Sequence, residues 1–205
     1  MGDIIVTKHI FTGVILAGGQ ARRMQGQDKG LVELGGSPMI QYVLDALSLQ
    51  VGTLIINANR NQEIYRHYGY PVVQDELDGY CGPLAGMASC MRLATTPFMV
   101  TSPCDSPFIP RNLVERLYLQ LVREDADISV AHNGERIQPV MALMKTSLLD
   151  SMIEYLHSGN RKIDTWYEQH SLTVTDFSDV PDTFLNINTR EDLENIESRL
   201  KDYGR

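Results

Sequence analysis

Short apolar runs alternate with longer segments of helical periodicity along most of the chain. Residues 13–17 (GVILA) are continuously apolar and bounded by glycines, which is typical of a strand buried in a parallel sheet. Similar runs predict strands at residues 53–58, 71–74, 98–101 and 127–131. Helical spacing predicts helices over residues 84–93 and 112–122, so strands and helices alternate as in βαβ units.

Two polar residues are expected to begin helices. Ser37 is expected to be the N-cap of a helix whose first residue is Pro38 and whose apolar positions continue to Leu47. Thr189 is expected to cap the last helix, with Asp192 three residues later reaching back.

One apolar segment departs from the alternation of strands and helices. Residues 138–145 (QPVMALMK) follow the predicted strand at 127–131 across Asn133-Gly134, which is a strong hairpin signal. We therefore expect antiparallel strands in the second half of the chain. The predicted fold is one α/β domain over residues 1–205, a three-layer α/β/α Rossmann-like arrangement with a mostly parallel mixed sheet.

Composition narrows the functional classes. The 205-residue chain has a formal net charge of −8, so it lacks the basic surplus of proteins that wrap nucleic acid. An anionic ligand must be met by a local basic cluster. Three cysteines without a CxxC pair argue against a disulfide framework or zinc site and indicate reduced thiols in the cytoplasm. No apolar run is long enough to span a membrane, and residues 1–9 lack the pattern of a signal peptide.

A glycine-rich loop with positive charge follows the first strand. Gly18 and Gly19 allow a ligand to approach the backbone closely, and their N–H groups suit phosphate oxygens. Arg22, Arg23 and Lys29 add three cations within eight residues. The loop lacks the Gly-Lys-Ser/Thr ending of a P-loop and the spacing of a dinucleotide fingerprint, although it still predicts a phosphate site.

Asp105 lies in a loop that two prolines, Pro103 and Pro107, are expected to rigidify after the strand at 98–101. A fixed carboxylate beside a triphosphate is an expected ligand of Mg²⁺. The predicted helix at 112–122 begins too late for Asp105 to cap it. Cys104 is interpreted as a packing residue, because no histidine or other base lies near it in the sequence.

Other polar residues leave two interpretations open. Asn57 ends a predicted strand, where its amide suits either a base edge or a turn. Asp75 follows the strand at 71–74, and its carboxylate suits either a turn or the N1–H and exocyclic amine of guanine. Asn186 and Asn188 would share one face of a strand or sit at a strand end as turn residues.

The string from Leu16 to Gly30, LAGG-x-A-R-R-M-x-G-x-D-K-G, resembles the signature of the molybdenum cofactor guanylyltransferases (MobA family). The resemblance extends from about Thr12 to about Leu200. It implies the nucleotide-diphospho-sugar transferase fold, with a nucleotide half at about 12–125 and an acceptor half at about 126–205.

The resemblance implies transfer of GMP from GTP to molybdopterin or the molybdenum cofactor, with Mg²⁺, or alternatively Mn²⁺, held by Asp105. It implies catalytic roles for Arg23, Lys29 and Asp105. It implies nucleotide contacts at Leu16, Ala17, Gly18, Gly19, Arg22, Lys29, Asn57, Asp75, Gly82 and Asp105. It implies acceptor contacts at Arg161, Asn186 and Asn188. It also implies transient contacts with molybdoenzyme maturation proteins. The composition, as described above, predicts a cytoplasmic protein with no nucleic-acid or membrane partner.

Three alternative functions remain at this point. The nearest is a related transferase that uses CTP or a sugar phosphate, since only base and acceptor contacts separate it from the guanylyl reading. A second is a non-catalytic nucleotide-binding maturation factor, against which the full set of Lys29, Asp105 and the arginines argues. A third is a dinucleotide oxidoreductase, which the missing fingerprint disfavours.

Overall fold

The computed structural model describes residues 6–19, 27–77, 82–187 and 189–202 of the 205-residue chain. Within these residues one mixed sheet has the strand order β5-β4-β1-β6-β8-β7-β9. The strands are β1 (Phe11–Leu16), β4 (Thr53–Asn57), β5 (Val72–Val73), β6 (Phe98–Pro103), β7 (Ile128–His132), β8 (Ile137–Lys145) and β9 (Leu172–Asp176). A separate hairpin pairs β2 (Glu33–Leu34) with β3 (Ser37–Pro38).

The first half of the sheet is parallel, and its register aligns three strand ends. Leu16 at the end of β1 pairs with Asn57 of β4 on one side and with Pro103 of β6 on the other. β8 then runs antiparallel to both β6 and β7, while β9 is parallel to β7. Segments that follow β1, β4 and β6 must therefore emerge at one edge of the sheet.

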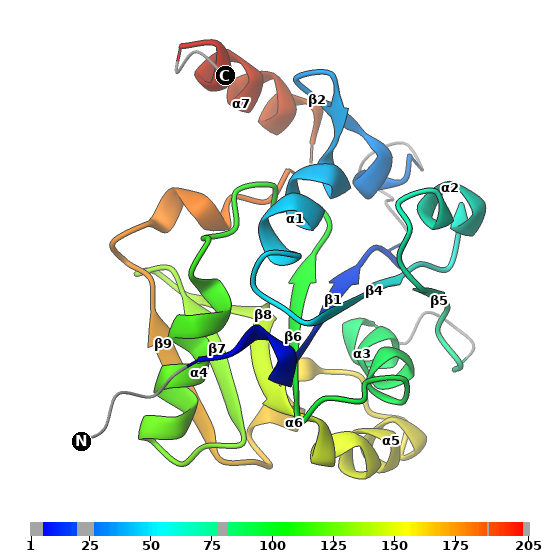
Figure 1. The fold of residues 1–205 in the computed structure, drawn as a ribbon, viewed down its shortest axis with the longest axis vertical. Helices are drawn as coiled ribbons and strands as arrows, with labels where there is room; N and C mark the ends of the chain where they lie inside the picture. The colour runs from blue at the N-terminus through cyan, green and yellow to red at the C-terminus, as the bar shows by residue number, and fades with distance from the viewer. Residues whose placement is uncertain (1–5, 20–26, 78–81, 188, 203–205) are drawn as a thin grey trace.

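Helices cover both faces of the sheet and produce three layers (Figure 1). α1 (Met39–Leu47) and α4 (Leu113–Arg123) pack in one buried cluster, and α3 (Pro83–Met91), α5 (Leu149–His157) and α6 (Ile163–Tyr167) pack in the other. The remaining helices are α2 (Gln62–Arg66), α7 (Arg190–Asp202) and the 3₁₀ helices η1 (Lys8–Ile10), η3 (Lys29–Leu31), η4 (Thr146–Leu148) and η5 (Pro181–Phe184). In β1, Val14 faces one cluster and Ile15 the other, so a continuously apolar strand is required there.

Most elements predicted from periodicity are confirmed, with boundary changes of a few residues. The hairpin at Asn133-Gly134 joins β7 to β8, as expected, and Gly134 has a positive φ of 96°. The cap at Thr189 is also confirmed, because the Thr189 N–H donates to Asp192 and the Asp192 N–H donates to Thr189 Oγ1.

The predicted cap at Ser37 is wrong. Ser37 and Pro38 form β3, and the helix begins at Met39 with no side-chain cap. Gly35 and Gly36 have φ values of 58° and 85°, and they turn the chain so that Pro38 stays extended beside Glu33. The strand expected at Asn186 is also absent, since residues 185–187 have no regular structure.

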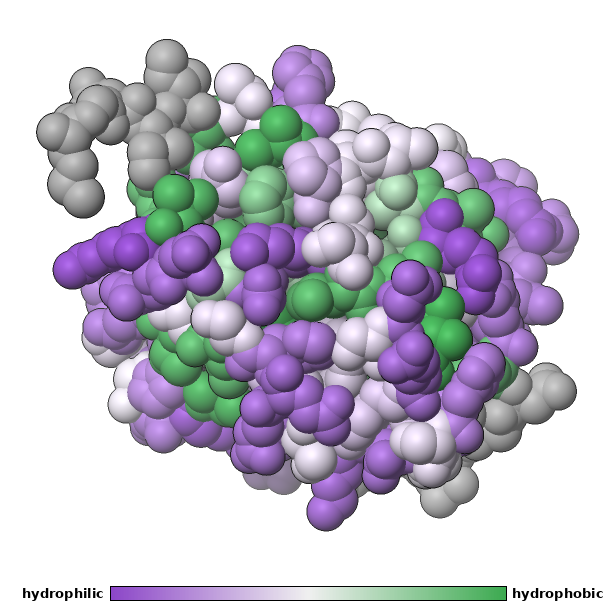
Figure 2. All heavy atoms as spheres, turned by 90° about the horizontal axis from the view of Figure 1, so that it is seen from below, coloured by the Kyte–Doolittle hydropathy of each residue, from purple (hydrophilic) through white to green (hydrophobic). Residues whose placement is uncertain are grey.

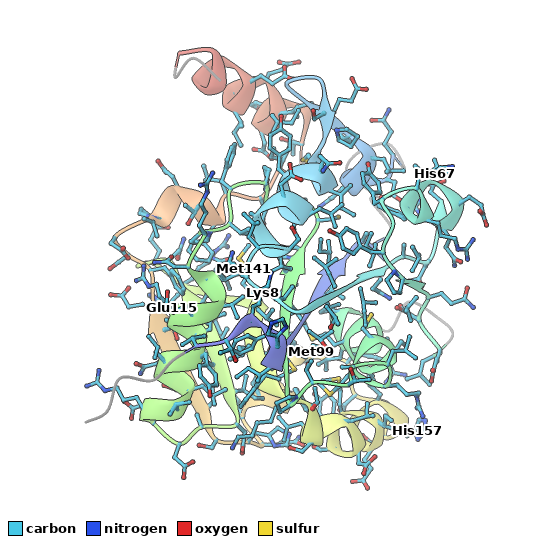
Figure 3. The ribbon with its side chains drawn as sticks, viewed as in Figure 1. Lys8, His67, Met99, Glu115, Met141 and His157 are labelled. Atoms are coloured by element: carbon cyan, nitrogen blue, oxygen red, sulfur yellow. The ribbon has the colours of Figure 1, made fainter. Side chains whose placement is uncertain are left out.

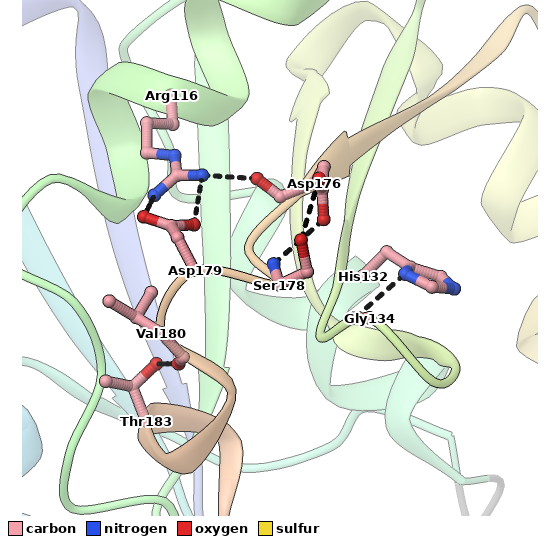
Figure 4. A network of polar contacts seen from close by, with 8 residues as sticks. All are labelled: Arg116, His132, Gly134, Asp176, Ser178, Asp179, Val180 and Thr183. Atoms are coloured by element: carbon pink, nitrogen blue, oxygen red, sulfur yellow. Dashed lines mark hydrogen bonds and ion pairs between the residues drawn. The ribbon is translucent and has the colours of Figure 1, made fainter.

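A polar network fixes the segment that follows β9 to α4 (Figure 4). Arg116 of α4 donates two hydrogen bonds to the Asp179 carboxylate, at 2.8 and 3.0 Å, and one to the Asp176 carbonyl. Its guanidinium lies 4.1 Å from the centroid of the Phe177 ring. These contacts join the last strand of the sheet to the helix layer.

Figure 2 shows mainly hydrophilic side chains on the lower face, with hydrophobic atoms in separate areas between them. In the part of the chain that the structure covers, no helix combines the length and the apolar character needed to cross a bilayer.

Candidate functional site

The carboxyl ends of β1, β4 and β6 bring the predicted nucleotide residues together. The Ala17 N–H donates to the Asn57 carbonyl at 2.8 Å, and the Cys104 N–H donates to the Leu16 carbonyl at 3.1 Å. Gly18, Asn57 and Asp105 thus start from neighbouring backbone positions. Ligands of open α/β sheets bind at this kind of edge.

A close ion pair lies at this edge. The Lys29 ammonium, on η3, donates to Asp105 Oδ2 at 2.8 Å. The side chains are 24% and 12% exposed, so the pair borders solvent while Asp105 is largely enclosed. Asp105 caps no helix, because α4 begins at Leu113. The predicted catalytic pair is therefore in direct contact.

The turn that carries Lys29 is anchored by a buried carboxylate that sequence reasoning did not identify. Asp28 is 8% exposed and accepts from Tyr65 Oη at 2.6 Å and from Asn61 Nδ2 at 3.1 Å. Gly30 leaves room for the Tyr65 hydroxyl, since a Cβ there would stand 2.6 Å from it. Burial, with the nearby Cys104 and Asp28, raises the pKa of Tyr65, so the phenol stays protonated as a donor.

Asp75 is held by two asparagines that follow β4. Asn57 Nδ2 donates to Asp75 Oδ1 at 2.9 Å, and Asn59 Nδ2 donates to Asp75 Oδ2 at 2.9 Å. Asn57 is 2% exposed and also donates to the Val73 carbonyl. Its amide protons are thus used within the protein, and Asp75, which is only partly buried, is the more accessible member of the predicted base-reading pair.

Two glycines pack against the Asn57 carboxamide. A Cβ at Gly18 would stand 3.0 Å from Asn57 Oδ1, and a Cβ at Gly86 of α3 would stand 2.3 Å from the same atom. Gly19 meets no neighbour within 4 Å, and its carbonyl accepts from Arg60 Nη2 at 3.1 Å. Arg60, in the segment that follows β4, thus brings a cation to the glycine loop, and the sequence pattern did not single it out.

The predicted acceptor residues lie around the same edge. Gly82, the N-cap of α3, has a φ of 77°, and its backbone lies beside the Arg161 carbonyl. The Arg161 guanidinium donates to the Leu156 and Asn160 carbonyls. Asn186 is hydrogen bonded to Ser106, next to Asp105, and the Ile187 N–H donates to the Asp105 carbonyl at 3.0 Å. Arg22, Arg23 and Asn188 lie outside the described residues.

The buried thiols near the site are unsuited to nucleophilic chemistry. Burial, reinforced by Asp105, raises the pKa of Cys104 well above its ordinary value. Burial, reinforced by Asp75, raises the pKa of Cys90 to about 12. Both stay protonated at neutral pH, in agreement with a packing role for Cys104. Figure 3 shows His67 just after α2 and His157 at the end of α5, so these two histidines come from different elements.

The donor set suits a magnesium ion carried in with a triphosphate. Asp105 Oδ2 accepts from Lys29, and no described residue donates to Oδ1. No group of three or more metal-ligating side chains occurs among the described residues. Mg²⁺ commonly binds one or two carboxylates together with phosphate oxygens and waters, so the single Asp105 carboxylate beside the predicted phosphate-binding loop fits it.

A family model and curated relatives indicate the same protein family for this chain. Residues 13–174 match the MobA-like NTP transferase domain. The molybdenum cofactor guanylyltransferase of Shewanella sediminis is 50% identical over 91% of this chain and 95% of its own length, and that of Shewanella piezotolerans is 49% identical over 91% and 92%.

Solved structures share the fold. Molybdopterin-guanine dinucleotide biosynthesis protein A of Archaeoglobus fulgidus superposes with a TM-score of 0.78 at 23% identity, covering 93% of this chain and 99% of that one. The 4-diphosphocytidyl-2C-methyl-D-erythritol synthase of Anaerococcus prevotii superposes with a TM-score of 0.75 at 13% identity, covering 96% and 98%. These two confirm the predicted fold class. The family match and the curated relatives show that the chain belongs to the molybdenum cofactor guanylyltransferases, within the MobA-like NTP transferase domain family.

Proposed function

We propose that this chain transfers GMP from GTP to the terminal phosphate of molybdopterin or the molybdenum cofactor and releases pyrophosphate. The observation that carries the proposal is the Lys29–Asp105 pair beside the glycine loop. It occurs in a chain that is 50% identical in sequence to a curated guanylyltransferase. A phosphate oxygen of the acceptor forms the new bond to the α-phosphorus while the bond to the β-phosphate oxygen breaks. The acceptor is already an anion, so no strong general base is required.

Catalysis in this proposal consists of positioning and charge neutralisation. The backbone of residues 16–19 approaches the phosphates, and Lys29, together with Arg22 and Arg23, neutralises their charge. Asp105 would hold Mg²⁺, or Mn²⁺ in its place, which when bound stabilises the negative charge on the leaving pyrophosphate. Lys29 and Asp105 hold one another in the free protein, so both groups are already oriented before the nucleotide arrives.

The other predicted contacts complete the two halves of the site. Asp75 accepts from the N1–H and exocyclic amine of guanine, with Asn57 supporting it from within the protein. Gly82 lets the chain approach the nucleotide at the N-terminus of α3. Arg161, Asn186 and Asn188 contact the acceptor. Contact with molybdoenzyme maturation proteins stays a prediction from the family, and action in the cytoplasm stays a prediction from the composition.

The test is pyrophosphate release with molybdopterin and each of the four ribonucleoside triphosphates. GTP should support turnover at least about tenfold better than the others, since hydrogen bonds to a charged group contribute about 1.5–3 kcal/mol. A preference for CTP would refute the guanylyl assignment in favour of a cytidylyltransferase. Nucleotide binding without pyrophosphate release would indicate a non-catalytic binding protein.

A further inference from the structure

We propose that Asn59 is a positioning residue for base selection, which fixes the Asp75 carboxylate and couples it to the glycine loop. This inference rests on the proposed function, in which Asp75 meets the base. The family signature from Leu16 to Gly30 does not include Asn59.

Asn59 makes two hydrogen bonds to Asp75, as the donor in one and the acceptor in the other. Asn59 Nδ2 donates to Asp75 Oδ2 at 2.9 Å, and the Asp75 backbone N–H donates to Asn59 Oδ1 at 2.8 Å. The Asn59 carboxamide therefore binds both the side chain and the backbone of Asp75. Because amide and carboxylate are planar groups, this double contact restrains rotation of the carboxylate.

Asn57 completes the restraint from the buried side. Asn57 Nδ2 donates to Asp75 Oδ1 at 2.9 Å, so each carboxylate oxygen accepts one bond from a different asparagine. A carboxylate has about four acceptor sites, so both oxygens keep capacity for a ligand. Asp75 is half-buried and its carboxylate is thus oriented while still able to accept.

Asn59 also reaches the loop that approaches the phosphates. Its Nδ2 lies 3.4 Å from the Gly18 carbonyl oxygen, and a Cβ at Gly18 would stand only 2.8 Å from that nitrogen. The absence of a side chain at Gly18 thus makes room for Asn59. One side chain links the group that meets the base to the loop that meets the phosphates.

This link matters for guanine because two parallel donors, N1–H and the exocyclic amine, must meet two oxygens in one plane. A carboxylate free to rotate would keep its charge and lose the alignment. The discrimination between GTP and ITP, which lacks the exocyclic amine, therefore reports the orientation of Asp75.

The test compares Asn59→Ala and Asn59→Asp with the unaltered chain, using equilibrium binding of GTP and ITP by calorimetry and steady-state pyrophosphate release. In the unaltered chain GTP should bind at least about tenfold more tightly than ITP, the scale of one hydrogen bond to a charged group. In Asn59→Ala the Kd and KM for GTP should rise about tenfold, while kcat should change less than about threefold. The GTP-to-ITP ratio, by which we mean the affinity for GTP divided by the affinity for ITP, should fall to about threefold or less. Asn59→Asp should lose more GTP affinity, because it sets a second carboxylate against Asp75.

Gln62→Ala is the matched control. The Gln62 amide bonds Gln74, next to Asp75 in sequence, and contacts neither Asp75 nor Gly18. Its GTP-to-ITP ratio should match that of the unaltered chain. An unchanged ratio in Asn59→Ala, or a kcat loss equal for both nucleotides with unchanged KM, would overturn the proposal.

The two readouts separate this inference from the proposed function. If the unaltered chain binds GTP but releases no pyrophosphate, the transferase assignment fails, while the binding ratio still decides the role of Asn59. Melting temperatures of all variants, recorded on the same samples, show whether each one is folded.

Discussion

Lys29 and Asp105 lie 76 positions apart in the sequence and meet at 2.8 Å. At this scale we expect Asp105→Asn and Lys29→Met each to lower turnover by at least about 100-fold. Lys29→Met removes a positive charge that neutralises the phosphates, and Asp105→Asn removes the carboxylate that would hold Mg²⁺. The melting temperature should change little, since partly exposed ion pairs contribute about 0–1 kcal/mol. Pyrophosphate release and thermal unfolding measure the two effects.

A second ion pair provides the control for this experiment. Lys145 donates to Asp127 at 2.9 Å, and the two side chains are 33% and 32% exposed. Lys145→Met removes a comparable contact far from the strand ends that carry Lys29 and Asp105, so turnover should be kept. Normal magnesium-dependent turnover in Asp105→Asn would contradict the metal role of Asp105.

Residues that act through the backbone or through distant neighbours were the hardest to predict. The strand ends identified the neighbourhood of Asp105 and Asn57, because a parallel sheet collects its carboxyl ends at one edge. The anchoring of Lys29 was not predictable, since Asp28 and Tyr65 are 37 positions apart and follow no shared period. The direction of the Asn57 side chain, inward to Val73 and Asp75, likewise depends on packing.

At the scale of the elements, α3 carries a prediction that runs against helix propensity. Replacing a glycine within a helix by alanine usually adds about 1 kcal/mol of stability. A Cβ at Gly86, however, would stand 2.3 Å from Oδ1 of the buried Asn57. We expect Gly86→Ala to destabilise the fold by about 1–3 kcal/mol through overpacking and to weaken GTP binding by displacing Asn57 from Asp75.

Chemical denaturation and calorimetry measure these two effects, and Ala88→Gly separates them. Ala88→Gly should also cost about 1 kcal/mol through helix propensity, without altering the contact with Asn57. Its affinity for GTP should be unchanged. Equal affinity in Gly86→Ala and the unaltered chain would show that Asn57 tolerates displacement.

Periodicity predicted the buried parallel strands well and missed β9 for a physical reason. In β9 the apolar Leu172 and Val174 are exposed, whereas Thr173 and Thr175 are buried. Thr175 and Ser129 satisfy each other with a hydrogen bond of 2.7 Å between their hydroxyls. A strand that buries threonine hydroxyls and exposes its apolar side chains reverses the usual alternation. The partners of those hydroxyls are known only once the sheet is assembled.

At the scale of the whole molecule, the proposed ligands should act as one stabilising unit. Groups from the β1 loop, η3, the β4 end and the β6 loop would all contact the same nucleotide, so binding should oppose global unfolding. At 100 times the Kd, magnesium and GTP together should add about 2.7 kcal/mol to the free energy of unfolding. For a chain of 205 residues this corresponds to a rise in melting temperature of about 5–10 °C.

Removing the metal separates the stabilisation by the nucleotide contacts from the stabilisation by the cation. With EDTA, GTP should retain the part of the shift that comes from Asp75 and the glycine loop and lose the part that requires a cation at Asp105. Asp105→Asn should therefore show the smaller shift whether or not Mg²⁺ is present, while ATP should produce less stabilisation than GTP in every case. GTP could instead raise the melting temperature of the unaltered chain by the same amount with EDTA as with Mg²⁺. The Asp105 carboxylate would then pair with Lys29 and bind no cation, and the basic side chains alone would neutralise the phosphates at this sheet edge.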